Sequence, residues 1–237
     1  MRIINPGYEM APFDAVEMIQ ALELAGRTCY KSEKKVTANS AEAFVRSLLK
    51  SGHESVLEHR SITVKFTIDR GTSHCLVRHR IASYSQESTQ YCNYSKDRFD
   101  GQITFIKPPW CYSIPPGEYD SMVQLQSVGV KAGTADIIWA EAMLDAELGY
   151  MYLIKAGWKP QQARTVPPAS VKTELVMTCN LRMWRHIFLQ RITTIADQAQ
   201  TRQVLTPLCK ELQFRLPSVF GDIHPLGWNH EGLYGKI

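Results

Sequence analysis

The clearest secondary-structure signal in this chain is the stretch ITVKFTID, at residues 62–69. Its apolar residues, Ile62, Val64, Phe66 and Ile68, alternate with polar ones. This period of two is typical of a β-strand with one buried and one exposed face, as in antiparallel sheets. The stretch therefore predicts a half-buried strand at the centre of the fold.

Two further stretches have strand character. Apolar or small side chains recur at Val171, Thr173, Leu175 and Met177, which predicts a second alternating strand. Residues 103–107 form a shorter apolar run that Pro108 and Pro109 terminate. Together these segments predict a sheet assembled from distant parts of the chain.

Helical periodicity dominates the remaining sequence. A first helix is expected over residues 13–25, between Pro12 and Gly26. A second is expected over 41–51, with Asn39 and Glu42 as a capping box and Gly52 at its end. Other helices are predicted from Thr72 or Ser73 through Ile81, over 118–156 with a break near 129–133, over 160–164, over 180–191 and over 197–214.

In the segment 180–191, the period predicts that Leu181, Trp184, Phe188 and Leu189 face inward and that Arg182, Arg185 and His186 face another side. The chain has no internal repeat, low-complexity tract or linker. A single α+β domain covering residues 1–237 is the simplest interpretation.

Bulk composition restricts the function. The net charge is +4 and the sequence pI is about 8.7. Nucleic-acid-binding domains typically have a pI above about 9. No apolar run approaches the roughly 20 residues that cross a bilayer. Six cysteines lack a C-x-x-C pair, and seven histidines lack metal-site spacing. We expect a soluble cytoplasmic protein with reduced thiols, no metal and no membrane partner.

Residues 78–91, RHRIASYSQESTQY, concentrate cationic, hydroxyl and amide side chains. Burying so many polar groups is costly unless each has a partner, so a hydrogen-bonding anionic ligand is the expected occupant. A second group of arginines spans 182–191, and Arg164 lies between the two groups. Solvated basic helix faces are the alternative, but both groups directly follow an alternating strand, which favours a site.

The pattern Arg78-His79-Arg80, then seven residues, then Ser88 resembles the signature of the flavin-dependent thymidylate synthases. The segment from Gly52 to His59 resembles that family's flavin-contacting turn, and Asn180-Leu181-Arg182 with Arg191 resembles its C-terminal block. The resemblance covers about residues 25–205, with the motifs in the family's order.

The resemblance implies a mixed, largely antiparallel sheet flanked by helices, in a homotetramer whose active sites are shared between subunits. It implies methylation of dUMP at C5 to dTMP. Methylenetetrahydrofolate would donate the carbon, and NADPH would act as reductant through bound FAD. A cysteine nucleophile is not part of that chemistry.

Roles follow from the resemblance position by position. The residues that match flavin-binding positions are His53, Ser55, Glu58, Arg78, His79, Arg80, Ile81, Asn180, Arg182 and His186. Those that match nucleotide-binding positions are Cys75, Arg78, Gln86, Ser88, Thr89, Gln90, Arg164 and Arg191. Arg191 is also the expected catalytic residue, because a fixed cation beside the pyrimidine stabilises negative charge as it develops.

Ser88 is interpreted as a binding residue and not as a nucleophile, since no base is evident beside it in the sequence. Two positions depart from the family pattern: Gln90 replaces the usual arginine, and Cys75 stands where a polar residue is common. Ser85-Gln86 in place of Asn-Glu is a milder change.

These departures leave a second hypothesis open, in which the same fold and flavin act on a different or modified pyrimidine nucleotide, or hydroxymethylate C5. A third hypothesis is a basic nucleic-acid-binding module, suggested by the mild charge and by Arg and Tyr residues near 78–94. Its binding would weaken steeply with salt. The modest charge and irregular aromatic spacing make it the weakest of the three.

Overall fold

The computed structural model describes residues 1–127, 129, 133–194 and 198–226. Contacts within the chain divide it into two compact units built from interleaved segments. Unit 1 comprises residues 1–7, 66–76 and 85–175, and unit 2 comprises 8–65, 77–84 and 176–237. Each unit is described by itself below. The expectation of a single domain over the whole chain stays a prediction.

Unit 1 contains a three-stranded mixed sheet in the order β5-β1-β6. Strand β1 (Arg2–Ile4) pairs in parallel with β5 (Thr104–Ile106) and antiparallel with β6 (Gly117–Glu118). Ile3 lies opposite Phe105, and both side chains are fully buried in the apolar core of this unit. The predicted strand near 103–107 is therefore confirmed.

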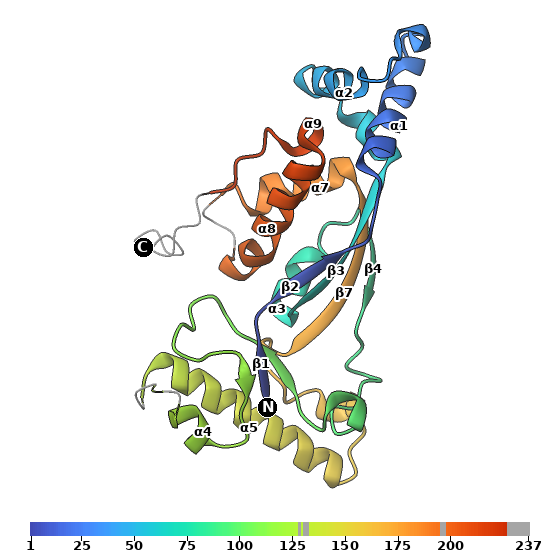
Figure 1. Cartoon of the computed structure of the whole chain (residues 1–237). Coiled ribbons are helices and arrows are strands. Elements are labelled where there is room, and N and C mark those ends of the chain that lie inside the picture. The colour runs from blue at the N-terminus through green and yellow to red at the C-terminus, as the bar shows by residue number, and fades with distance from the viewer. Residues whose placement is uncertain (128, 130–132, 195–197, 227–237) are drawn as a thin grey trace. The chain divides into compact units, whose positions relative to one another are not determined.

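Helices complete unit 1 (Figure 1). They are α3 (Arg70–Leu76), the 3-10 turn η3 (Asp97–Phe99), α4 (Met122–Ser127), α5 (Ala135–Lys155) and α6 (Pro160–Ala163). Helix α5 contributes Ile137, Ala140 and Met143 to the core that also holds Ile3. Burial of these side chains fixes the 85–175 segment, on which five of the eight predicted nucleotide-binding residues lie, namely Gln86, Ser88, Thr89, Gln90 and Arg164.

Unit 2 is mainly helical (Figure 1). Its helices are α1 (Ala15–Thr28), α2 (Ala41–Lys50), α7 (Leu181–Arg191), α8 (Ala199–Arg215) and α9 (Pro217–Phe220), with 3-10 turns η1 (Glu33–Lys35) and η2 (Glu54–His59). Trp184 of α7 stacks on Phe188, which meets Phe220 of α9 edge to face, each pair with centroids 5.8 Å apart. This aromatic core holds α7 in place.

A four-stranded sheet has the order β2-β3-β7-β4, with β2 (Gly7–Met10), β3 (Ser61–Asp69), β4 (Ser83–Gln86) and β7 (Lys172–Asn180). Both alternating strands predicted from the sequence are confirmed. On β3 the four apolar side chains are buried, and on β7 Thr173, Leu175 and Met177 are. The α+β class, with mixed and antiparallel sheets, is thus confirmed.

Several predicted helix ends are wrong. Helix α1 runs through Gly26 to Thr28. Gly26 has no Cβ, which leaves room for the Phe44 side chain of α2. A Cβ there would lie 2.7 Å from the Phe44 ring, so this glycine serves helix packing. The Asn39 capping box is also wrong, since Ser40 is the N-cap of α2 and makes no side-chain cap bond. Gly52, at φ 73°, does end that segment as predicted.

Further corrections concern α3, α4 and α8. Helix α3 ends at Leu76 and does not reach Ile81, so Arg78 lies outside it. Glu118 belongs to β6 and not to a helix. The break predicted near 129–133 separates α4 from α5, although residues 130–132 lie outside the described residues. Asp197, the predicted start of the last helix, also lies outside them, and α8 ends at Arg215.

The faces of α7 differ from the predicted ones. Arg185 is buried, at 5% exposed, whereas Leu189 is 44% exposed. Arg185 can face inward because Asp222 and the Val219 carbonyl accept hydrogen bonds from its guanidinium.

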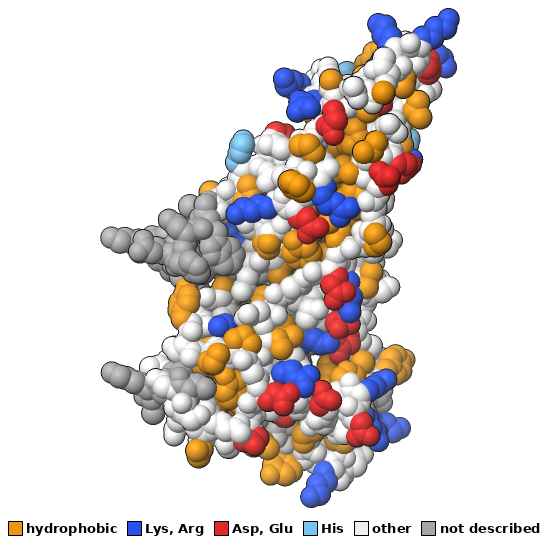
Figure 2. All heavy atoms as spheres, viewed as in Figure 1, with side chains coloured by type: hydrophobic (Ala, Val, Ile, Leu, Met, Phe, Trp, Pro, Cys, Tyr) orange, Lys and Arg blue, Asp and Glu red, His pale blue; other side chains and the backbone are white. Residues whose placement is uncertain are grey.

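No helix among the described residues is long and apolar enough to cross a membrane. On the face shown in Figure 2, Lys and Arg side chains alternate with acidic and apolar ones and form no continuous basic band. This distribution gives no support to the nucleic-acid hypothesis.

Candidate functional site

The signature Arg78-His79-Arg80 lies in the short connection between α3 and β4. His79 points into unit 2 and is 5% exposed, while Arg78, Arg80 and Ile81 are exposed. Ile81 alone exposes 67% of its surface. This connection therefore offers two guanidinium groups and an apolar side chain to a ligand and uses His79 as an anchor.

His79 joins Arg191 and His186 of α7 in one cluster. Arg191 Nε donates to His79 Nε2 over 3.1 Å, and the His79 and His186 rings meet edge to face with centroids 5.9 Å apart. Tyr84 Oη donates to the His79 carbonyl over 2.6 Å. The structure thus brings together residues predicted as cofactor-binding and catalytic from positions 112 apart in the sequence.

The His79 imidazole is neutral near pH 7. Burial, and then electrostatic interactions with Arg191 and His186, lower its pKa to about 4. Because Nε2 accepts from Arg191, the proton of the neutral ring is assigned to Nδ1. Burial likewise raises the pKa of Tyr84 to about 12, which keeps its hydroxyl a donor. The neutral His79 ring orients Arg191 through this hydrogen bond and adds no charge of its own.

The η2 turn is fixed to α7 by charge pairs. Arg182 Nη1 donates to Glu58 over 2.6 Å, and Arg185 Nε lies 3.5 Å from Glu54. Arg185 also forms a two-pronged contact with Asp222, at 2.6 and 2.8 Å, and donates to the Val219 carbonyl. The Arg185 guanidinium lowers the pKa of the Asp222 carboxyl below its ordinary value. These pairs set the position of the residues on either side of Glu54.

His53, Ser55 and Asn180 lie at the ends of these elements. His53 and Ser55 are exposed, and the His53 Nδ1 atom lies 3.5 Å from the Tyr30 hydroxyl. Asn180 caps α7, because its side-chain oxygen accepts from the Met183 amide over 2.8 Å. Every residue predicted to bind flavin belongs to unit 2.

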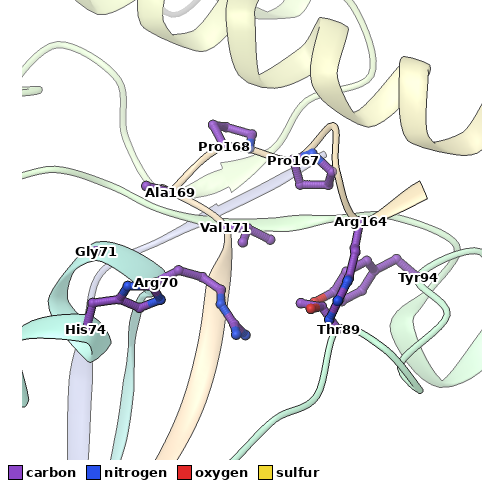
Figure 3. A pocket seen from close by; sticks show the side chains of 10 residues that line it. All are labelled: Arg70, Gly71, His74, Thr89, Tyr94, Arg164, Pro167, Pro168, Ala169 and Val171. Carbon is purple, nitrogen blue, oxygen red and sulfur yellow. The ribbon is translucent and has the colours of Figure 1, made fainter. Parts of the chain in front are cut away.

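Unit 1 holds a pocket of about 220 Å³ (Figure 3). Its described lining residues are Arg70, Gly71, His74, Thr89, Tyr94, Arg164, Pro167, Pro168, Ala169 and Val171. Thr89 and Arg164, both predicted to bind the nucleotide, lie on one flank of the pocket, and Arg70 lies on the other. No carboxylate is among these ten residues, so the pocket is cationic.

Gln86 and Arg70 meet at the buried Thr173 hydroxyl. Gln86 Nε2 donates to it over 3.2 Å and to Ser73 Oγ over 2.9 Å, and Arg70 Nη1 donates to it over 3.3 Å. Arg70 Nη1 also donates to the Glu87 carbonyl over 3.2 Å. Gln86, predicted to bind the nucleotide, has a structural part in this network.

Ser88 opens a turn and Gln90 follows it. Ser88 Oγ accepts from the Gln90 amide over 3.3 Å, and the Ser88 carbonyl accepts from the Cys92 amide over 2.9 Å. Gln90 is exposed and Cys75 is half-buried, and neither lines the pocket of unit 1. Arg78 and Arg191, also predicted to bind the nucleotide, belong to unit 2.

Three residues at these sites were missed by the sequence analysis. Arg70 and Tyr94 line the pocket, and Arg185 anchors the η2 turn. Arg70 directly follows the alternating strand, which was an available signal. Arg185 and Tyr94 were noted only as members of the groups at 182–191 and 78–94, since their neighbours become visible only in the folded chain.

The chain matches the family model for the thymidylate synthase complementing protein over residues 14–218. It is 32% identical over 218 residues to a flavin-dependent thymidylate synthase of Mycobacterium sp. (strain JLS), which covers 86% of this chain and 80% of the relative. The chain belongs to the flavin-dependent thymidylate synthase family. An enzyme of the same family from Geobacter sulfurreducens is also 32% identical, over 212 residues, 86% of this chain and 82% of the relative.

Solved structures share the fold of the family. The UMP/dUMP methylase PolB from Streptomyces cacaoi, bound with 5-Br dUMP, has a TM-score of 0.71 at 22% identity over 93% of this chain and 96% of that one. Thymidylate synthase X from Helicobacter pylori, with FAD and dUMP, has a TM-score of 0.67 at 19% identity over 92% and 98%. The resemblance drawn from the signature residues is confirmed at the level of the family.

Proposed function

We propose that the chain methylates dUMP at C5 to give dTMP, with methylenetetrahydrofolate as carbon donor and NADPH as reductant through FAD. Membership of a flavin-dependent family supports the class of reaction. The observation that carries the proposal is the bond between His79 and Arg191, which holds a permanent cation in a fixed orientation. A cation placed in this way suits a pyrimidine whose ring gains negative charge during the reaction.

The residues of unit 2 fit a flavin dinucleotide. Arg78 and Arg80 are exposed guanidinium groups suited to a diphosphate, and Ile81 presents an apolar surface suited to a ring system. His53, Ser55, Asn180 and His186 add polar groups on the adjoining η2 and α7 elements. When bound, FAD supplies the hydride that completes the methyl group.

The chain's own residues bind and orient the nucleotide in this proposal. Thr89 and Arg164 contact its phosphate and sugar, and Ser88 holds the turn that carries Thr89. Arg191 donates to the pyrimidine edge and stabilises the ring anion, while neutral His79 keeps the guanidinium in place. Arg78, Gln86, Gln90 and Cys75 complete the proposed contacts.

The active assembly in this proposal is a homotetramer whose sites combine residues of different subunits. Measurement of mass in solution by light scattering tests this part, and a monomer that turns over substrate would contradict it.

A second candidate keeps the fold and flavin but changes the nucleotide, or hydroxymethylates C5. Gln90 and Cys75 motivate it, because both differ from the side chains that the family usually has at these positions. Product mass spectrometry on a panel of UMP, dUMP and C5-modified nucleotides separates the candidates. Exclusive formation of dTMP from dUMP would eliminate the second candidate.

The main test is reconstitution. The purified chain should be yellow, with flavin absorption, and should convert dUMP to dTMP when methylenetetrahydrofolate and NADPH are supplied. Omission of NADPH is the matched control and should stop turnover. A chain that purifies without flavin and does not take it up on reconstitution would refute the proposal.

A further inference from the structure

The hydroxyl of Tyr84 is bonded to the backbone of the signature in unit 2. Tyr84 lies on β4, at the end of the segment 77–84 that belongs to this unit. Its Oη atom donates to the His79 carbonyl over 2.6 Å, at the short end of the range for such bonds. The bond spans five residues and therefore ties the connection between α3 and β4 to the strand that follows it.

The donor end of this bond is held by the sheet. Tyr84 is half-buried, and β4 pairs with β7, which carries the buried Cys179. Burial, and then the electrostatic interaction with Cys179, raise the pKa of the phenol to about 12. A carbonyl oxygen can only accept, so the bond requires a protonated phenol, and Tyr84 stays protonated at neutral pH.

His79 connects this bond to Arg191. Its carbonyl accepts from Tyr84, and its side-chain Nε2 atom accepts from Arg191 Nε over 3.1 Å. Both groups belong to one residue, so a fixed carbonyl restricts the direction in which the imidazole leaves the backbone. Hydrogen bonds weaken steeply when they are misaligned, so a rotation of the His79 backbone would loosen the bond to Arg191. Strand β4, Tyr84, His79 and Arg191 thus form one continuous chain of contacts.

We propose that Tyr84 is a positioning residue for the reaction: its hydroxyl holds the His79 carbonyl and thereby sets the imidazole that orients the Arg191 guanidinium. The inference rests on the proposed function and extends it to a residue that is not among those predicted to bind substrate or flavin. A charge stabilises a transition state most when its position is fixed before the reaction, and small displacements of such a group are costly. Tyr84 supplies part of that fixation from outside the site.

The first test is kinetic and uses Tyr84→Phe, which keeps the ring and removes only the hydroxyl. At saturating FAD, kcat for dTMP formation should fall by about threefold to tenfold, while the KM for dUMP changes by less than about twofold. In the Arg191→Ala protein the same substitution should lower kcat by less than about twofold further, because its effect passes through Arg191.

Tyr119→Phe is the matched control. Tyr119 is 5% exposed, belongs to unit 1, and donates from its Oη atom to the Pro115 carbonyl over 2.8 Å. This variant loses the same kind of bond, so its stability should fall by a similar amount, but its kcat should change by less than about twofold. An equal fall of kcat in Tyr119→Phe, an unchanged kcat in Tyr84→Phe, or independent effects of Tyr84→Phe and Arg191→Ala would overturn the inference.

A second measurement separates this inference from the proposed function. In the nitrogen-15 NMR spectrum of the purified protein, the Arg191 Nε–H signal is assigned as the one missing from Arg191→Lys. Its exchange with water should be at least about fivefold faster in Tyr84→Phe and unchanged in Tyr119→Phe. That result would support the positioning role even if no dTMP formed. Conversely, dTMP formation together with an unchanged Arg191 signal in Tyr84→Phe would leave the proposed function standing and remove the inference.

Discussion

The arginines of α7 in unit 2 and those that line the pocket of unit 1 have different surroundings. In unit 2, Arg182 and Arg185 pair with Glu58 and Asp222, and Arg191 is held by His79. In unit 1, Arg70 and Arg164 line a pocket that has no carboxylate among its described lining residues. A paired guanidinium positions the backbone around it, whereas one without a carboxylate attracts an anion. The comparison predicts that substitutions in unit 2 affect chemistry and stability, and those in the unit 1 pocket affect ligand affinity.

The largest effect is expected for Arg191→Ala. Loss of a fixed cation that stabilises developing charge should lower kcat by about 10²–10³-fold, with little change in thermal stability. Steady-state kinetics with dUMP checks this, and Gln190→Ala, at an exposed neighbouring position, is the control. A fall in kcat below about threefold would show that Arg191 is only a structural partner of His79.

Arg185→Met should destabilise the fold by about 1–3 kcal/mol, the range of hydrogen bonds to charged groups. Asp222 is itself 62% exposed at its side chain, so the carboxylate left behind can be solvated. Arg182→Met is the matched control on the same helix and should cost less than about 1 kcal/mol, because that pair is half exposed. Urea unfolding measures both, and equal losses would contradict the difference in burial.

Arg164→Gln should raise the KM for dUMP by about tenfold while kcat changes little, because a charge-assisted contact is lost from substrate binding. Flavin content should remain that of the unsubstituted protein, since Arg164 belongs to unit 1. A loss of flavin would show that Arg164 of unit 1 also affects flavin binding, which is predicted for residues of unit 2.

The His79 imidazole should make stability depend on pH. Its pKa is lowered to about 4 in the folded chain, below its ordinary 6.5, so between these values the unfolded chain binds the extra proton. Stability should therefore fall as the pH is lowered from about 6.5 to 4. In His79→Gln this part of the slope should disappear, as measured by urea unfolding across that range. An unchanged slope would show that His79 is protonated in the folded chain.

The smallest effect is expected for Gln90→Arg. Because position 90 is exposed and does not line the pocket of unit 1, a cation there should change dUMP affinity by less than about threefold. Gln90→Ala is the control for loss of the amide. A gain of tenfold or more would show that position 90 contacts the phosphate and that the pocket of unit 1 is incomplete without it.

The sequence alone determined what depends on local pattern. Alternation over 62–68 and 171–177 was enough to predict β3 and β7, because a half-exposed strand carries its period in its own residues. Spacing in Arg78-His79-Arg80 and Ser88 was enough to identify the family. That Thr89 and Arg164 bind the nucleotide was implied by the resemblance and stays a prediction, although the fold brings both residues to one pocket.

Only the tertiary structure decided which charges are paired. Arg185 faces inward because Asp222, 37 residues away, and the Val219 carbonyl satisfy its guanidinium. The period of α7 has no information about such a distant partner. Arg70 and Tyr94 likewise come to line one pocket only when the core of unit 1 brings their segments together. Long-range hydrogen bonding and burial, which a one-dimensional pattern does not encode, determine these positions.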